Sequence, residues 1–165
     1  MTMRVTPAAK PTGTKSAGLK PPRKKPSPER WASDVIVDLL HRYQLPYAAL
    51  NPGASYRGLH DSIVNYGQNY PYMMLCQHEE TAVQIAHGYA KASGKPMVAI
   101  VHNLVGLLHS NMAVYYAYID RAPIFIIGAT GPMDETNRRP RIDWTHTANV
   151  QVETSRTSSS GTPGI

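Results

Sequence analysis

The sequence contains one cysteine and no long run of apolar residues. Cys76 has no second thiol in the chain, so no internal disulfide can form, and we expect a reducing, cytoplasmic setting. No apolar run reaches the roughly 18 residues that a membrane span requires. The first 30 residues also lack the apolar segment of a secretory signal. We therefore expect no membrane partner.

Several common ligand motifs are also missing. Neither the dinucleotide pattern G-x-G-x-x-G nor a phosphate-binding loop ending in Gly-Lys-Ser/Thr occurs. His78-Glu79 begins like the zinc-protease pattern H-E-x-x-H, but position 82 is alanine. His102 and His109 could share a helix face, yet no carboxylate stands at ligand spacing from them. The sequence therefore predicts no metal site.

The positive charge lies almost entirely in the leader. Residues 1–30 hold eight of the 17 Lys and Arg residues but one acid, Glu29, whereas the rest is nearly neutral. Residues 1–27 are rich in Pro, Lys, Thr, Gly and Ser, and we expect them to be disordered. The run Pro-Pro-Arg-Lys-Lys-Pro at 21–26 could bind an anionic surface, and the acid-poor composition is compatible with a transit peptide. A solvated leader is the simpler interpretation, so nucleic acid is not expected as a partner.

Residues 28–150 alternate between helix and strand patterns. Ser27 and Pro28 are typical of a helix start, and apolar residues then recur at helical spacing to Tyr43. Further helices are expected at 55–66, 79–93 and 105–119, and strands at 47–50, 72–76, 97–101 and 124–127. This order predicts an α/β fold with a doubly wound, mostly parallel sheet. Residues 151–165 are of low complexity and are expected to be disordered.

The helix expected at 105–119 is apolar on nearly every face. A surface helix carries a polar stripe, so this one should be covered on two sides. One cover is the domain's own sheet, and the other would be a second domain or subunit.

Glu79 stands where the strand at 72–76 passes into the next helix. Ligands of open parallel sheets bind beyond the carboxyl ends of the strands, which is where this carboxylate would lie. A Glu at a helix start can also simply complement the helix dipole. The residues alone leave both interpretations open.

A set of short motifs identifies a family. The chain resembles the N-terminal, pyrimidine-binding domain of thiamine diphosphate enzymes, and within them the acetolactate synthase group. The resemblance covers about residues 31–150 and is carried by Leu50-Asn51-Pro52-Gly53-Ala54, Gln77-His78-Glu79, the helix 82–94 with His87-Gly88-Tyr89-Ala90, and Ala117-Tyr118-Ile119-Asp120-Arg121-Ala122-Pro123.

The resemblance implies a catalytic role for Glu79. In the family, the matching glutamate hydrogen-bonds a pyrimidine ring nitrogen of thiamine diphosphate, and the cofactor acts as the electron sink for a small 2-oxo acid. Glu80 would then be the residue that complements the helix dipole. Pro52 and Gly53 would shape the loop near the cofactor, with Ala54 and Ser55 only neighbours.

One turn departs from the family pattern. Acetolactate synthases carry Ser-Gly-Pro-Gly after the third strand, whereas this chain has Asn103-Leu104-Val105-Gly106. His109 falls where the family usually has Asn. We expect Asn103, Gly106 and His109 to lie at the cofactor site. His102 is either a substrate-facing acid or base or a hydrogen-bonded structural residue.

The motif that holds the diphosphate and Mg²⁺ in the family, Gly-Asp-Gly…Asn, does not occur. The chain would therefore bind only the pyrimidine end of the cofactor. Mg²⁺ and the diphosphate would be bound by the diphosphate-binding domain of another subunit or chain, in a homo- or hetero-oligomer.

Three functions follow from the resemblance. The first is the N-terminal half of an acetolactate synthase-like decarboxylase or carboligase, incomplete and inactive alone. The second is the small subunit of a split 2-oxo acid decarboxylase of the sulfopyruvate or phosphonopyruvate type. The third is a non-catalytic binding module that uses the basic leader.

Overall fold

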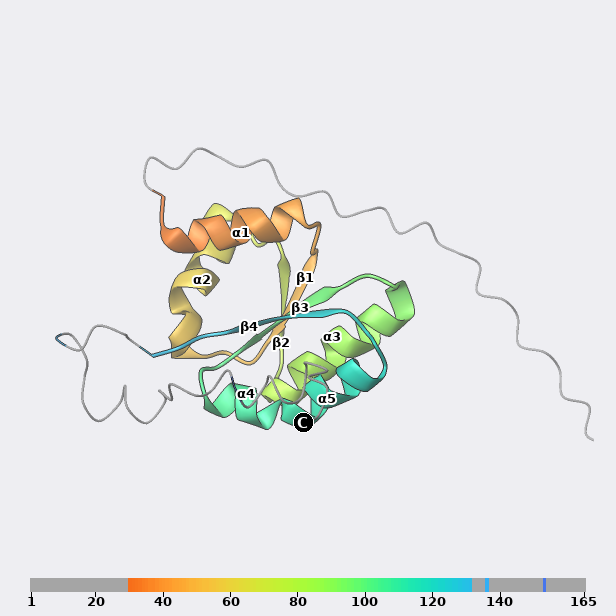
Figure 1. Ribbon diagram of the computed structural model, residues 1–165. Coiled ribbons are helices and arrows are strands. Elements are labelled where there is room, and N and C mark those ends of the chain that lie inside the picture. The colour runs from red at the N-terminus through yellow and green to blue at the C-terminus, as the bar shows by residue number, and fades with distance from the viewer. Residues whose placement is uncertain (1–29, 132–135, 137–152, 154–165) are drawn as a thin grey trace, which may run out of the picture.

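A parallel sheet forms the centre of the fold (Figure 1). The computed structural model describes residues 30–131, 136 and 153. The order of the strands is β2-β1-β3-β4, and every neighbouring pair is parallel. The strands are β1 (Tyr47–Leu50), β2 (Tyr72–Leu75), β3 (Met97–Val101) and β4 (Ile124–Gly128). The expected leader and nearly all of the expected low-complexity end lie outside the described residues.

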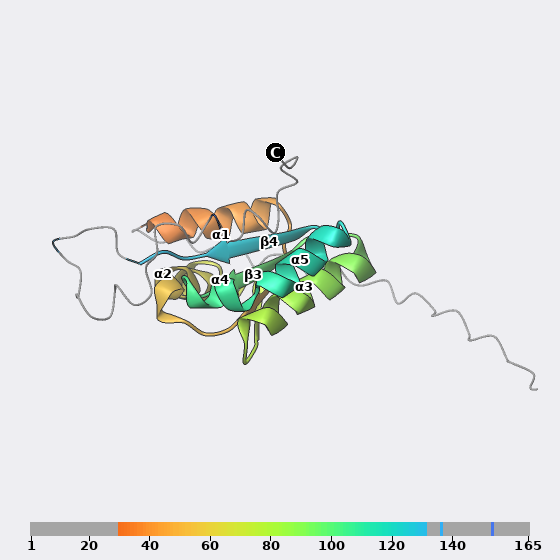
Figure 2. The same ribbon diagram turned by 60° about the horizontal axis from the view of Figure 1, so that its bottom comes forward.

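Helices cover both faces of this sheet, which confirms the predicted doubly wound α/β fold. Figure 2 shows β4 running between α1 on one side and the α4–α5 layer on the other. The first layer consists of α1 (Ala32–Arg42), a 3₁₀ turn η1 (Ala54–Tyr56), α2 (Arg57–Asp61) and a π-helical turn η2 (Ser62–Tyr66). The second layer consists of α3 (Glu79–Ser93), α4 (Val105–His109) and α5 (Asn111–Ile119).

Strand β3 connects the two cores. All five of its residues are buried, as expected for a central strand covered on both faces. Successive side chains of a strand point to opposite faces, so Val98 and Ile100 join the core under α1 and α2, while Met97, Ala99 and Val101 join the core under α3 and α5. This explains why the sequence shows a continuous apolar run instead of an alternation.

Helix α3 and strands β1 and β3 have the predicted bounds, but other elements differ. Helix α1 begins at Ala32, where the Trp31 N–H donates to the Asp34 carboxylate (2.9 Å), so the helix starts later than predicted, and Ser27 and Pro28 lie outside the described residues. Strand β2 ends at Leu75, although the Cys76 N–H still donates to the Leu50 carbonyl (2.7 Å). The helix expected at 55–66 consists of three short segments.

The predicted helix 105–119 is broken at Ser110. Its buried hydroxyl donates to the Leu107 carbonyl (3.0 Å), and a serine that bonds the preceding turn competes with regular helix bonds. The break turns α5 into a separate helix that packs on α3. No described helix combines the length and the apolar character that crossing a bilayer requires.

A polar junction ties α3 to the end of α5. The Asp120 carboxylate accepts hydrogen bonds from Lys91 (2.6 Å) and is 2.9 Å from His87 Nε2. The hydrogen bond from Lys91 holds the pKa of Asp120 below its ordinary value. Desolvation raises this pKa and so opposes the effect, whereas the hydrogen bond with His87 lowers it further. The left-handed Gly94 (φ 69°) ends α3 as predicted.

Candidate functional site

Glu79 is the first residue of α3 and lies at the carboxyl end of the sheet, as its position after β2 predicts. The residue is only 5% exposed. The Oε2 atom of Glu79 is 3.7 Å from the Nδ1 atom of His109, a residue thirty positions later in the chain. A buried carboxylate interacts more strongly with a nearby polar group than an exposed one does, because the local dielectric is low.

Gly106 packs directly against this carboxylate. A Cβ atom at position 106 would lie 2.9 Å from Glu79 Cγ, 3.2 Å from Glu79 Oε1 and 3.0 Å from His102 Cβ. Only glycine fits this close approach without moving a neighbour. The first turn of α4 therefore restricts the position of the Glu79 side chain.

Gly53 makes a similar approach to His102. A Cβ atom at position 53 would lie 2.6 Å from His102 Cδ2. The Nδ1 atom of His102 is within hydrogen-bond distance (3.0 Å) of the Asn103 carbonyl. These contacts favour the structural interpretation of His102. Pro52 is exposed in the same turn as Gly53.

Ser55 joins the two turns to each other. The backbone N–H of the buried Asn103 donates to Ser55 Oγ (3.2 Å). Ser55 is therefore more than the neighbour it was expected to be, because it connects the loop after β1 with the loop after β3. Both loops end at the same edge of the sheet, and that is where Glu79 lies.

Tyr56 belongs to this edge as well, and the sequence interpretation missed it. Its hydroxyl donates to the carbonyl of Asn51. Burial, together with the nearby negative charge of Glu79, raises the pKa of Tyr56 to about 12, although a backbone hydrogen bond at Gly53 acts in the opposite direction. The sequence feature that could have indicated Tyr56 is its position three residues after Gly53 of the Pro-Gly turn.

Leu104 has an unusual backbone conformation in the turn that departs from the family pattern. Its φ of 49° and ψ of −75° lie near the rare and strained γ-turn region. Side chains with a Cβ rarely adopt this region, and strain of this kind clusters at functional sites. The strain arises at the position where acetolactate synthases carry glycine.

Replacing Leu104 by glycine is expected to stabilise the protein by about 1 kcal/mol. Relief of roughly 1–3 kcal/mol of strain outweighs the entropy that glycine adds to the unfolded chain, roughly 0.5–1 kcal/mol. Urea unfolding would measure the change. Leu108→Gly in α4, where the backbone is helical, should instead destabilise by about 1 kcal/mol. A lower stability of Leu104→Gly than of the unchanged protein would contradict the strain argument.

Two histidine rings lie beside Glu79. The rings of His78 and His109 stack with their centroids 4.9 Å apart and their planes 15° apart. His78 is also the N-cap of α3, since its Nδ1 atom accepts the backbone N–H of Glu80 (3.2 Å). The structure therefore places both His109 and His78 beside Glu79.

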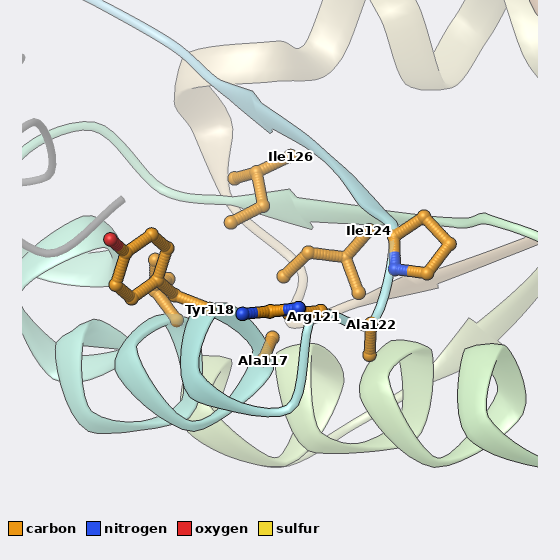
Figure 3. A pocket seen from close by; sticks show the side chains of 8 residues that line it. Ala117, Tyr118, Arg121, Ala122, Ile124 and Ile126 are labelled. Atoms are coloured by element: carbon orange, nitrogen blue, oxygen red, sulfur yellow. The ribbon is translucent and has the colours of Figure 1, made fainter. Parts of the chain in front are cut away.

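A separate hollow lies away from this edge. It measures about 440 Å³ and lies between α5 and β4, where Ile124 and Ile126 face Ala117 and Tyr118 (Figure 3). The residues that line it do not include any of those around Glu79. The hollow is lined mainly by apolar side chains, together with Arg121, and lies where α5 packs on the sheet.

Known proteins resemble this chain in sequence and in fold. The chain is 34% identical over 103 residues to the acetolactate synthase large subunit of Lactococcus lactis, covering 61% of this chain and 17% of that protein. It is 32% identical over 102 residues to a probable 2-ketoarginine decarboxylase of Pseudomonas aeruginosa, covering 59% and 17%. Benzoylformate decarboxylase from Polynucleobacter necessarius has the same fold, with a TM-score of 0.54, 21% identity and coverage of 70% and 23%.

The chain thus spans about a sixth of the length of these two curated relatives. A family model also matches residues 30–154, which include every described element of the sheet and its helices. That model describes the N-terminal TPP binding domain of thiamine pyrophosphate enzymes, and the chain belongs to this family.

Proposed function

We propose that this domain binds the pyrimidine end of thiamine diphosphate in an acetolactate synthase-like 2-oxo acid decarboxylase or carboligase. The observation that carries the proposal is the buried carboxylate of Glu79 at the carboxyl end of the sheet, held in place by Gly106. Glu79 would hydrogen-bond a ring nitrogen of the cofactor and hold a proton there.

The residues around Glu79 fit such a ring. Gly53, in the turn after β1, and Gly106, in α4, leave no room for side chains of their own, which would let a ligand approach the backbone closely beside the carboxylate. A buried, oriented carboxylate stabilises a proton gained by a neighbouring nitrogen more effectively than one in water. When bound, thiamine diphosphate would supply the electron sink for decarboxylation. Asn103 and His109 would border the ring from the side of α4.

The diphosphate and Mg²⁺ would be bound by a separate domain. We infer that this domain packs on the outer face of α4 and α5, which follow directly after the turn that contacts Glu79. One side of α5 packs on α3 and joins the core beside the sheet, where the sheet was the expected cover, but the opposite side exposes large apolar side chains. The exposed residues of this α4–α5 face are Leu108, Met112, Tyr115, Tyr116, Tyr118 and Ile119.

The substrate class that fits this proposal is a small 2-oxo acid. The names of the two curated relatives describe an acetolactate synthase and a decarboxylase of a 2-keto acid. The turn from Asn103 to Gly106 would face the substrate, so its departure from the acetolactate synthase pattern would set the choice among such acids.

Calorimetric titration with thiamine diphosphate and Mg²⁺ tests the proposal. The full chain alone is expected to show no measurable binding, and binding should appear when a diphosphate-binding domain of a related enzyme is added. Glu79→Gln should weaken that binding, whereas Glu80→Gln, which changes the neighbouring carboxylate, should not. Tight binding by the chain alone would refute the shared site.

A further inference from the structure

Three side chains with metal-binding atoms converge at the start of α3. His78, Glu79 and His109 each offer one nitrogen or oxygen atom, and these atoms all lie within 4.8 Å of one another. The expected pattern H-E-x-x-H is absent because position 82 is alanine, but the fold supplies the second histidine from α4. The prediction of no metal site rested on spacing along the chain and did not consider this pairing.

The donor atoms are suited to a transition metal. Two imidazoles and one carboxylate form a ligand set that Zn²⁺ accepts, usually with a fourth position left to water. His78 Nδ1 accepts the Glu80 N–H, so Nε2 carries the proton in the neutral ring, and coordination by either nitrogen would replace this cap hydrogen bond.

The other two ligands complement this arrangement. The Glu79 carboxylate is buried, and the Nδ1 atom of His109 is 3.7 Å from its Oε2 atom, a distance that an ion between them could bridge. The His109 side chain is 51% exposed, so coordination would require its ring to turn out of the stacked position on the solvent side. The negative charge of Glu79 would be neutralised by the cation, which lowers the cost of keeping it buried.

We propose that His78, Glu79 and His109 form a site for Zn²⁺ with one position open to water. Glu79 is also the acid of the proposed thiamine site, so Zn²⁺ and the cofactor ring would compete for the same carboxylate. The competition rests on the proposed function, but the metal site does not, since the ligands all belong to this chain.

The test is a titration of the full chain, first stripped with a chelator, with ZnCl₂ in competition with a zinc-sensitive dye. We expect one Zn²⁺ per chain and a higher unfolding temperature when it is bound. His78→Asn, Glu79→Gln and His109→Asn should each weaken binding at least about 10-fold, because even loss of a partner behind a ligand costs about that much. Asparagine at position 78 can still cap α3, so this variant separates metal binding from folding.

His60→Asn serves as the matched control, because His60 is also an exposed histidine beside a carboxylate, that of Asp61. It should leave the affinity unchanged. The absorption of bound Co²⁺ provides a second readout, with imidazole coordination expected to be lost in His109→Asn. The absence of stoichiometric binding, or equal affinity in His78→Asn, His109→Asn and the unchanged chain, would overturn the site. Neither measurement requires thiamine diphosphate or a partner domain, so failure here leaves the cofactor proposal to its own test.

Discussion

Glu79→Gln is expected to lower 2-oxo acid decarboxylation at least about 100-fold in an enzyme assembled from this chain and a diphosphate-binding domain. Glutamine keeps the shape and the packing against Gly106 but removes the negative charge. A preorganised polar group in a dry site typically contributes about 10²–10³ in rate, and Glu79 is 5% exposed. Pyruvate is the first substrate to assay, by release of carbon dioxide.

Glu80→Gln is the control for this variant. Both residues lie in the first turn of α3, so both substitutions remove one favourable charge from the helix N-terminus. A role of Glu79 limited to the helix dipole would give similar results for the two variants, with small losses of stability and no selective loss of rate. Full activity of Glu79→Gln in a folded, assembled enzyme would show that the assignment of the acid is wrong.

The elements that the sequence predicted well are those with strong local signals. Strand β3 is a continuous apolar run between Pro96 and a polar turn, and α3 is closed by Gly94, whose left-handed conformation suits glycine. The position of Glu79 followed from these two kinds of boundary, since β2 and α3 left few positions between them. The parallel order of the strands then placed the carboxylate at the edge of the sheet where ligands bind.

The parts that sequence reasoning missed depend on contacts between distant segments. The break at Ser110 arises from a hydroxyl bond within one turn, and the apolar pattern around it shows no sign of an interruption. Tyr56 reaches the site from the segment after β1, and His78, although adjacent to Glu79 in the sequence, meets His109 only because α4 lies beside the start of α3. Hydrophobic periodicity reports which face of an element is buried, but not which polar side chain it meets.

The α4–α5 face also shows that the sequence predicts whether an element is buried but not what it contacts. The sequence predicted a helix covered on two sides, and the structure contains one cover, helix α3 and the sheet beneath it. Met112 and Tyr116 are 51% and 46% exposed and lie four residues apart, so they point the same way on α5. An exposed apolar surface of this kind marks an interface.

The isolated chain is therefore expected to self-associate through the α4–α5 face, and a Met112→Lys/Tyr116→Lys double variant should shift it to the monomer. Each half-exposed side chain contributes about 1 kcal/mol when covered, so losing both weakens association at least about 30-fold. Burying two ammonium groups in the contact would weaken it further. Sedimentation velocity over a range of concentrations would measure the change.

Val35→Lys provides the matched control for this experiment. Val35 is 52% exposed on α1, in the layer that covers the opposite face of the sheet, so lysine there adds charge and removes an exposed apolar side chain without touching α5. It should leave the association unchanged. If the unchanged chain is already a monodisperse monomer at high concentration, the α4–α5 face does not drive association. If Val35→Lys dissociates the chain as effectively as the double variant, net charge, and not this face, controls assembly.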